Sequence, residues 1–387
     1  MDFSQLFNTF KEQNISGRYI HLGHIRSLLD TLNTNGQVTI IGQSVLQNPV
    51  YAYQLGTGTT KILCWSQMHG NESTTTKALF DLFNFLNGDD KIANTLRSHF
   101  TFYFIPILNP DGAFLYTREN ANQVDLNRDA QNLSQPESKI LREVYAAFQP
   151  DYCFNLHDQR TIFGVGNTSK PATVSFLAPS YDEEKNINEV RKKAIRVINS
   201  MYTTLKDYIP GQIGRFDDSF NINCIGDTFQ HLGTPTVLFE AGHYQNDYER
   251  EHTRKYVFIA LLSGMLSIYQ NAIFDDEIDY YMNIPQNTPN FFDFVYKNIK
   301  FNYDHSEIIT NFALQYKEEL IENKIFFNAF IIKIGELDNF FGHVEVDAGQ
   351  ELYSDNLENK PHIGQKADFC LGKAIKVING KVVNDAG

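Results

Sequence analysis

The stretch that decides the fold is Lys61-Ile-Leu-Cys-Trp-Ser-Gln-Met-His-Gly-Asn-Glu72. Its first half is an apolar run of strand length, and its second half is a polar turn that carries His69 and Glu72. A strand that turns into a helix here can aim both side chains at one place. A neutral imidazole and a carboxylate are among the commonest protein ligands of zinc. A structural histidine in a turn, followed by a glutamate at a helix N-terminus, would produce the same sequence. The pair alone is therefore weak evidence for a metal site.

Apolar runs of strand length alternate with segments of helical periodicity on both sides of this stretch. Strands are expected at 38–41, 50–55, 62–65, 100–108, 151–156, 174–177 and 236–239, and helices at 72–86, 136–148, 183–205, 227–232 and 249–273. This alternation predicts an α/β fold, in which a mixed, mostly parallel sheet has helices on both faces.

Two further polar side chains follow apolar runs directly. His157 comes after the run 151–156, and Glu240 comes after the run 236–239. Ligands of open α/β sheets bind beyond the carboxyl ends of the strands. We therefore expect both residues to share one edge of the sheet with His69. Taken alone, a histidine is more often a buried structural residue than a metal ligand. A glutamate after an apolar run can simply be the first residue of the strand that reaches water.

The composition sets limits on the partners of the chain. With 387 residues, the chain is long enough for a large α/β domain and a smaller one. The net charge of -13 argues against nucleic acid and anionic membranes as partners. The sequence shows neither a signal peptide nor an apolar run of about 18 residues, so we expect a cytoplasmic protein. The four cysteines are far apart, and we interpret those in apolar runs as buried thiols.

The alternation of strand-length apolar runs with helical segments ends near residue 275. We expect an N-terminal helical segment at 1–35, a catalytic domain at 36–275, a linker or bracing segment at 276–299, and a small, mostly β domain at 300–387. Asn379-Gly380 between apolar runs is a strong hairpin signal in this last part. Three histidines there are expected to be structural: His305, His343 and His362.

Five motifs, taken in order, resemble those of the zinc carboxypeptidase family of metallopeptidases. They are His69-Gly-Asn-Glu72, Leu108-Asn-Pro-Asp-Gly112, Arg118 with Val124-Asp-Leu-Asn-Arg128, His157, and Pro235-Thr-Val-Leu-Phe-Glu240. The resemblance covers roughly residues 36–273 and none of the C-terminal part. It implies one zinc ion per chain, with His69, Glu72 and His157 as its ligands. Asp125 would be the carboxylate that orients the imidazole of His69.

The resemblance also implies roles for four residues around the metal. Arg118 would polarise the scissile carbonyl and stabilise the oxyanion. Glu240 would be the general base. Asn127 and Arg128 would hold the terminal carboxylate of the substrate, which suits a guanidinium fork.

Two enzyme activities stay open at this stage. Digestive members of the family have Arg where this chain has Asn71, and they carry a substrate-capping Tyr, whereas no Tyr lies between Ile209 and Glu240. The aspartoacylase and succinylglutamate desuccinylase branch shares two of the motifs and a small C-terminal β domain. Asn109-Pro-Asp-Gly112 fits the carboxypeptidase branch better. The substrate is therefore expected to be a peptide or an acyl-amino acid with a free carboxylate. An inactive peptide-binding module is a third reading, which intact Glu240 and the three intact ligands argue against.

Overall fold

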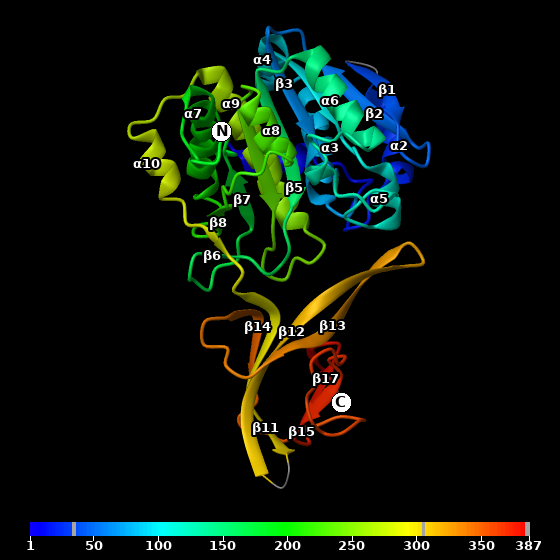
Figure 1. Cartoon of the computed structure of the whole chain (residues 1–387), viewed down its shortest axis with the longest axis vertical. Coiled ribbons are helices and arrows are strands. Elements are labelled where there is room, and N and C mark those ends of the chain that lie inside the picture. The colour runs from blue at the N-terminus through cyan, green and yellow to red at the C-terminus, as the bar shows by residue number, and fades with distance from the viewer. Residues whose placement is uncertain (33–35, 304–305, 384–387) are drawn as a thin grey trace. The chain divides into compact units, whose positions relative to one another are not determined.

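The structure is a computed structural model that describes residues 1–32, 36–303 and 306–383 (Figure 1). The chain forms two compact units: Met1–Gln159 with Ala172–Asn287, and Arg160–Pro171 with Thr288–Gly387. Each unit is therefore assembled from two separate stretches of sequence.

We expected residues 276–299 to form a linker or bracing segment, whereas the structure divides them between the two units. Helix α10 (Glu277–Met282) belongs to the first unit, and strand β11 (Phe291–Tyr303) belongs to the second. Phe294 and Tyr296 of this strand are buried in the core of the second unit. These aromatic residues explain why the segment forms a paired strand instead of a connection.

The first unit is built around an eight-stranded sheet in the order β1-β2-β4-β3-β5-β9-β7-β8. Its strands are β1 (Gln37–Gln43), β2 (Pro49–Leu55), β3 (Thr60–Trp65), β4 (Phe100–Ile105), β5 (Tyr152–Asp158), β7 (Val174–Leu177), β8 (Ile213–Arg215) and β9 (Thr236–Ala241). The central strands β4, β3, β5 and β9 are parallel to one another, whereas the β1–β2, β2–β4 and β9–β7 pairs are antiparallel. The expected mixed sheet with a parallel centre is confirmed.

Helices cover both faces of this sheet (Figure 1). They are α1 (Phe3–Phe10), α2 (Leu22–Leu32), α3 (Thr74–Asn87), α4 (Lys91–His99), α5 (Pro110–Leu115), α6 (Pro136–Phe148), α7 (Glu189–Leu205), α8 (Ile225–His231), α9 (Glu251–Gln270) and α10. In β3, Ile62 and Cys64 pack into the core that contains α3, α7 and α9. Leu63 and Trp65 point the other way, into the core that contains α6 and α8. A central parallel strand is buried on both faces, which explains why this run is apolar throughout.

The N-terminal helices belong to the same core. Phe7 of α1 and Leu29 of α2 are buried with the residues of α3 and α9. Helix α4 was not expected, because with only Ala93 and Leu96 buried its sequence shows little helical periodicity of apolar residues. The helix begins after Asp90, whose side chain accepts a hydrogen bond from the backbone N–H of Ile92. Across the described ranges, no helix is both long enough and apolar enough to cross a bilayer.

The second unit is mainly β, as expected for the C-terminal part. Its two four-stranded sheets have the orders β13-β12-β11-β14 and β15-β16-β17-β18. The remaining strands are β12 (Ser306–Ile321), β13 (Lys324–Ile334), β14 (Phe341–Asp347), β15 (Tyr353–Ser354), β16 (Phe369–Leu371), β17 (Ile375–Ile378) and β18 (Lys381–Val383), with the short β6 (Gly164–Val165) and β10 (Asn287–Thr288) forming a separate pair. Asn379 and Gly380 both have positive φ and join β17 to β18, which is the expected hairpin.

Candidate metal centre

The turn between β3 and α3 is shaped by contacts with a second turn before α5. A Cβ atom on Gly70 would lie 1.9 Å from the backbone carbonyl carbon of Gly112, so only glycine fits there. Asn109 connects the two turns, because its side chain accepts from the backbone N–H of Gly112 and donates to the carbonyl oxygen of Met68. The H-G-N-E and N-P-D-G motifs are therefore two sides of one packed turn.

His69, Glu72 and His157 form a buried cluster whose ligand atoms lie within 4.8 Å of one another. Glu72 Oε1 lies 2.9 Å from His69 Nδ1, and Glu72 Oε2 lies 2.8 Å from His157 Nδ1. The two Nδ1 atoms are 3.1 Å apart. Two imidazole nitrogens and one carboxylate, turned toward one point, are a donor set that zinc accepts with one position left for water. Within the described ranges, no other group of three such residues could hold a metal.

Asp125 orients the imidazole of His69 from the other side. Asp125 Oδ1 lies 2.9 Å from His69 Nε2, so the ring can donate from Nε2 and keep its Nδ1 lone pair toward the cluster. Burial alone would raise the pKa of Asp125, but the hydrogen bond with His69 and the charge of Arg118 lower it below its ordinary value. Asp125 also accepts from the backbone N–H of Asn127, which fixes the start of the next segment.

Glu72 is held as a carboxylate. Burial raises its pKa, but the neighbouring imidazoles of His69 and His157 outweigh this effect and lower the pKa below the ordinary value. The backbone N–H of Asp158 also donates to Glu72 Oε2 at 3.1 Å. The carboxylate of Asp158 in turn accepts from the backbone N–H of Thr74, at the start of α3. Asp158 was not expected at this site, because no local pattern distinguishes it from an ordinary acidic residue at the end of a strand.

Glu240 lies on the strand next to His157. The two residues are register partners in the parallel pair of β5 and β9. Asn155 and Leu238, two residues earlier on each strand, are also partners, and their side chains point to the same face of the sheet. Glu240 is 9% exposed, and its pKa is raised well above the ordinary value by burial and by the charges of Glu72 and Asp158.

We expected His157 and Glu240 to lie just past the ends of their strands. The structure places both within the strands instead. The β5–β9 pairing continues through Asp158 and Ala241, beyond the apolar runs that the sequence shows.

Arg118 lies beside the cluster. Its Nη1 atom donates to Glu72 Oε1 at 3.3 Å, and its Nε and Nη2 atoms donate to Asp125 Oδ2 at 3.2 and 3.0 Å. Its side chain is 41% exposed, so the guanidinium is open to solvent while it contacts the two carboxylates.

Asn127 and Arg128 follow Asp125 and meet the start of α8. Asn127 Oδ1 accepts from the backbone N–H of Ile225 at 3.0 Å. Arg128 is exposed and forms no ion pair with any residue that the structure describes. Its Nη1 atom donates to the carbonyl oxygen of Asn127 and to Sγ of Cys224. Cys224 was not expected at this site, because it lies 96 residues from Arg128 along the chain.

Two of the three histidines of the C-terminal part, His343 and His362, are described by the structure, and neither is in the cluster. His343 Nε2 lies 2.7 Å from the carbonyl oxygen of Thr161, and His362 Nε2 lies 3.1 Å from Glu358. His305, the third histidine expected to be structural, lies outside the described residues.

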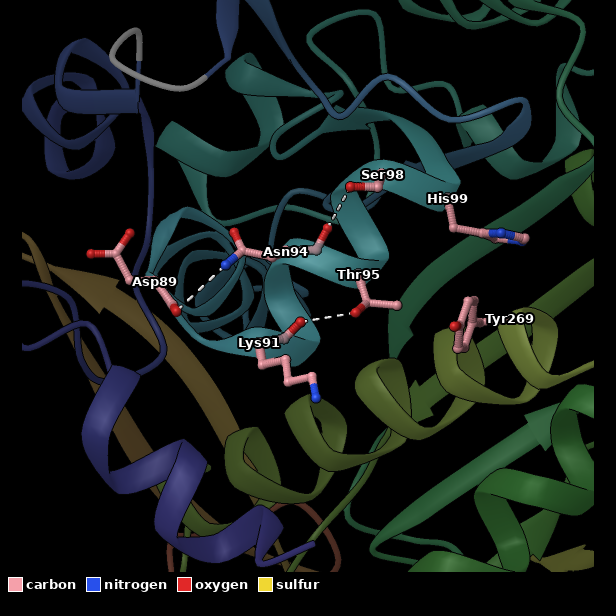
Figure 2. Close-up of a pocket in the computed structure, with 7 residues that line it drawn as sticks. All are labelled: Asp89, Lys91, Asn94, Thr95, Ser98, His99 and Tyr269. Carbon is pink, nitrogen blue, oxygen red and sulfur yellow. Dashed lines mark hydrogen bonds between the residues drawn. The ribbon is translucent and has the colours of Figure 1, made fainter.

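A hollow of about 580 Å³ lies at α4 and the end of α9 (Figure 2). His99, which lines this hollow, comes just before the amino end of β4. The cluster of His69, Glu72 and His157 lies beyond the carboxyl end of β3, which runs parallel to β4. The hydroxyls of Thr95 and Ser98 bond to carbonyl oxygens of their own helix. This hollow therefore lies at the opposite end of the sheet from the cluster, and two of the hydroxyls that line it are already bonded within α4.

Comparisons with known proteins agree with the expected family. The profile of the family described as zinc carboxypeptidase matches residues 25–258. The "Probable carboxypeptidase 2" of Trichophyton verrucosum is 29% identical over 132 residues, which are 33% of this chain and 25% of that protein. The match thus spans only a quarter of the length of this curated relative.

Solved structures of carboxypeptidases share the fold. A metallo-carboxypeptidase from Burkholderia cenocepacia superposes with a TM-score of 0.53 at 18% identity, over 65% of this chain and 69% of that one. Carboxypeptidase A from Helicoverpa armigera gives a TM-score of 0.53 at 14% identity, over 70% and 80% of the two chains. At such identities the likeness supports the fold and not the details of the site.

Proposed function

The chain belongs to the zinc carboxypeptidase family, and on that premise we propose that it is a metallocarboxypeptidase that removes the C-terminal residue of a peptide. The observation that carries the proposal is the buried cluster of His69, Glu72 and His157 beside the buried carboxylate of Glu240. This combination brings a metal site, formed by the turn after β3 and by β5, next to a carboxylate on β9 that can act as a base.

We assign one zinc ion per chain to His69 Nδ1, Glu72 and His157 Nδ1. Asp125 holds the ring of His69 in the tautomer that this assignment requires. When bound there, zinc supplies a Lewis acid for the scissile carbonyl and lowers the pKa of its water toward about 7.

Glu240 is assigned as the general base. Its carboxylate takes a proton from the attacking water and gives it to the leaving amine. Burial and nearby carboxylates raise its pKa in the metal-free protein, and a raised pKa suits a group that holds the proton between these two transfers. Arg118 is assigned to the negative charge that develops on the carbonyl oxygen, because its guanidinium lies beside the cluster and is open to solvent.

Arg128 is assigned to the terminal carboxylate of the substrate, with Asn127 beside it. Arg128 is exposed and has no ion pair among the residues that the structure describes, so its charge is available to a ligand, and its planar fork matches a carboxylate. Asn127 Oδ1 is used to hold the start of α8, which leaves the amide Nδ2 for a substrate oxygen. Recognition of this anion would restrict cleavage to the last peptide bond.

A zinc N-acyl-amino-acid amidohydrolase is the second candidate. Asn71, the absence of a Tyr between Ile209 and Glu240, and the β-rich second unit favour it. The chain's carboxypeptidase relatives and the match of Asn109-Pro-Asp-Gly112 favour the first candidate. The cytoplasmic location stays a prediction.

The two candidates differ in what they accept on the acyl side of the scissile amide. A carboxypeptidase tolerates a peptide there and requires a free C-terminus. We expect the zinc-loaded protein to cleave an N-blocked tripeptide and to lose that activity when the C-terminus is amidated, because Arg128 then has no anion to bind. Equal rates on the two peptides would refute carboxypeptidase action. Turnover confined to N-acetyl- or N-succinyl-amino acids would establish the second candidate.

A further inference from the structure

The guanidinium of Arg128 has one side-chain partner among the residues that the structure describes. Its Nη1 atom donates to Sγ of Cys224 at 3.2 Å and to the carbonyl oxygen of Asn127 at 2.8 Å. Cys224 is partly exposed and directly precedes helix α8, where its thiol makes no capping bond to the backbone. The sulfur is therefore in a position to orient the exposed guanidinium of Arg128.

The backbone around both residues is fixed by other bonds, so this contact does not depend on a loose loop. Several hydrogen bonds join the two segments, among them Ile225 N to Asn127 Oδ1 (3.0 Å), Ala130 N to Asn223 O (3.3 Å) and Gln131 Nε2 to Ile222 O (3.1 Å). These bonds hold the Cα positions of Arg128 and Cys224 relative to each other. What remains free is the long side chain of Arg128, and the thiol limits that freedom.

A thiol suits this position better than a charged acceptor would. Burial raises the pKa of Cys224 to about 11, so the sulfur is neutral at ordinary pH. A neutral sulfur accepts a weak hydrogen bond and leaves the positive charge of Arg128 uncompensated. A carboxylate at the same place would pair with the guanidinium and compete with the carboxylate of a substrate.

We propose that Cys224 is a positioning residue for recognition of the terminal carboxylate: its thiol holds the Arg128 guanidinium so that the remaining N–H groups can receive that anion. Ordering a flexible arginine before the ligand arrives reduces the entropy lost on binding. The proposal rests on the proposed function, in which Arg128 binds the substrate carboxylate.

The test compares three substitutions of Cys224 in the zinc-loaded full chain. Steady-state KM and kcat are measured on an N-blocked dipeptide with a free C-terminus. We expect Cys224→Ala to raise KM about fivefold with kcat within about threefold, which is the size of one ordinary hydrogen bond. Cys224→Ser keeps an acceptor and should recover most of the wild-type KM. Cys224→Asp should raise KM more than Cys224→Ala does, because the new carboxylate competes for Arg128.

Two further variants separate positioning from a general structural role. In an Arg128→Met background, Cys224→Ala should add no further change in KM, because the thiol acts only through the guanidinium. Cys370→Ala removes a partly exposed cysteine of the second unit and should leave KM unchanged. An unchanged KM in Cys224→Ala, or an effect of the same size in the Arg128→Met background, would overturn the proposal.

A binding measurement keeps this test distinct from the test of the proposed function. Butyrate carries a carboxylate but no amide, so neither candidate enzyme can cleave it. Calorimetry should show weaker butyrate binding to Cys224→Ala than to wild type or Cys224→Ser. Equal butyrate affinities in all three proteins would refute the role of Cys224, whether or not the enzyme proves to be a carboxypeptidase.

Discussion

His157 and Glu240 are register partners on the neighbouring parallel strands β5 and β9. Directly paired residues of adjacent strands project from the same face of a sheet. The separation of these two side chains is therefore set by the ladder at the centre of the sheet and not by a surface loop. A site that joins a metal-binding imidazole to a base gains from this arrangement, because strands hold geometry more firmly than loops do.

The first prediction concerns the metal. We expect about one zinc per chain in the wild-type protein, and a large loss of zinc from His69→Ala and from His157→Ala, since each removes one of three protein ligands. Elemental analysis after dialysis measures the occupancy. His343→Ala is the matched control, because this histidine lies outside the cluster. Full zinc occupancy in both cluster variants would rule out the assignment.

The second prediction concerns Glu240. Glu240→Gln preserves shape but cannot take up a proton, so turnover should fall by roughly 10²–10⁴-fold. Zinc content and the thermal midpoint should remain close to those of wild type, because the side chain is not one of the assigned ligands. Activity within about threefold of wild type would mean that another group is the base.

The third prediction concerns the geometry at Arg128. Arg128→Lys keeps the charge but replaces a planar fork by a single ammonium group, so it should not be conservative. We expect KM for a peptide with a free C-terminus to rise at least about tenfold, with a smaller change in kcat. If Arg128→Lys and wild type had the same KM, bidentate binding of the terminal carboxylate would be excluded.

The fourth prediction concerns stability in acid, away from the metal. Glu251 of α9 lies 2.6 Å from the buried ammonium group of Lys77 on α3. Burial would raise the pKa of Glu251, but Lys77 and Lys11 lower it from 4.5 to about 2. A pKa lowered in the folded state means that this carboxylate contributes stability above pH 4.5, and that the contribution is lost as the pH falls toward about 2.

Glu251→Gln should therefore be less stable than wild type at neutral pH, and the difference should shrink as the pH falls from about 4.5 to about 2. Urea unfolding at several pH values measures both effects. Glu183→Gln, at an exposed position, is the control and should follow the wild-type curve. A constant difference between Glu251→Gln and wild type across this range would contradict the assignment.

The fifth prediction concerns the packed turn under the metal site. In Gly70→Ala, the new Cβ would overlap the backbone of Gly112, so one of the two turns must move. Overpacking of this kind costs about 1–3 kcal/mol or more. We expect a lower thermal midpoint together with weaker zinc binding, because His69 is the residue before Gly70. Unchanged zinc affinity would show that the turn can shift without moving its ligand.

Part of this site could be predicted because its signals are local. His69 and Glu72 lie in one turn, and the apolar runs before His157 and Glu240 indicate which edge of the sheet they reach. Cys224 could not be found in this way. Its contact with Arg128 joins segments separated by 96 residues, and only the packing of α8 brings them together.

The boundaries of the two units were harder to predict for the same reason. The segment Arg160–Pro171 has no long apolar run, and nothing in its own sequence assigns it to the C-terminal part. Its partners are distant in sequence: Gln315 donates to the hydroxyl of Thr161, and the backbone N–H of Phe291 donates to the carbonyl oxygen of Ile162.

This arrangement has a consequence for how the protein is made. Arg160–Pro171 leaves the ribosome more than a hundred residues before the strands with which it forms the second unit are complete. It begins three residues after His157, so β5 is joined directly to a segment whose packing partners have not yet been synthesised. Contacts of such long sequence separation form late. A nascent chain that stopped near residue 287 would therefore carry Arg160–Pro171 without the strands of its own unit, close in sequence to His157.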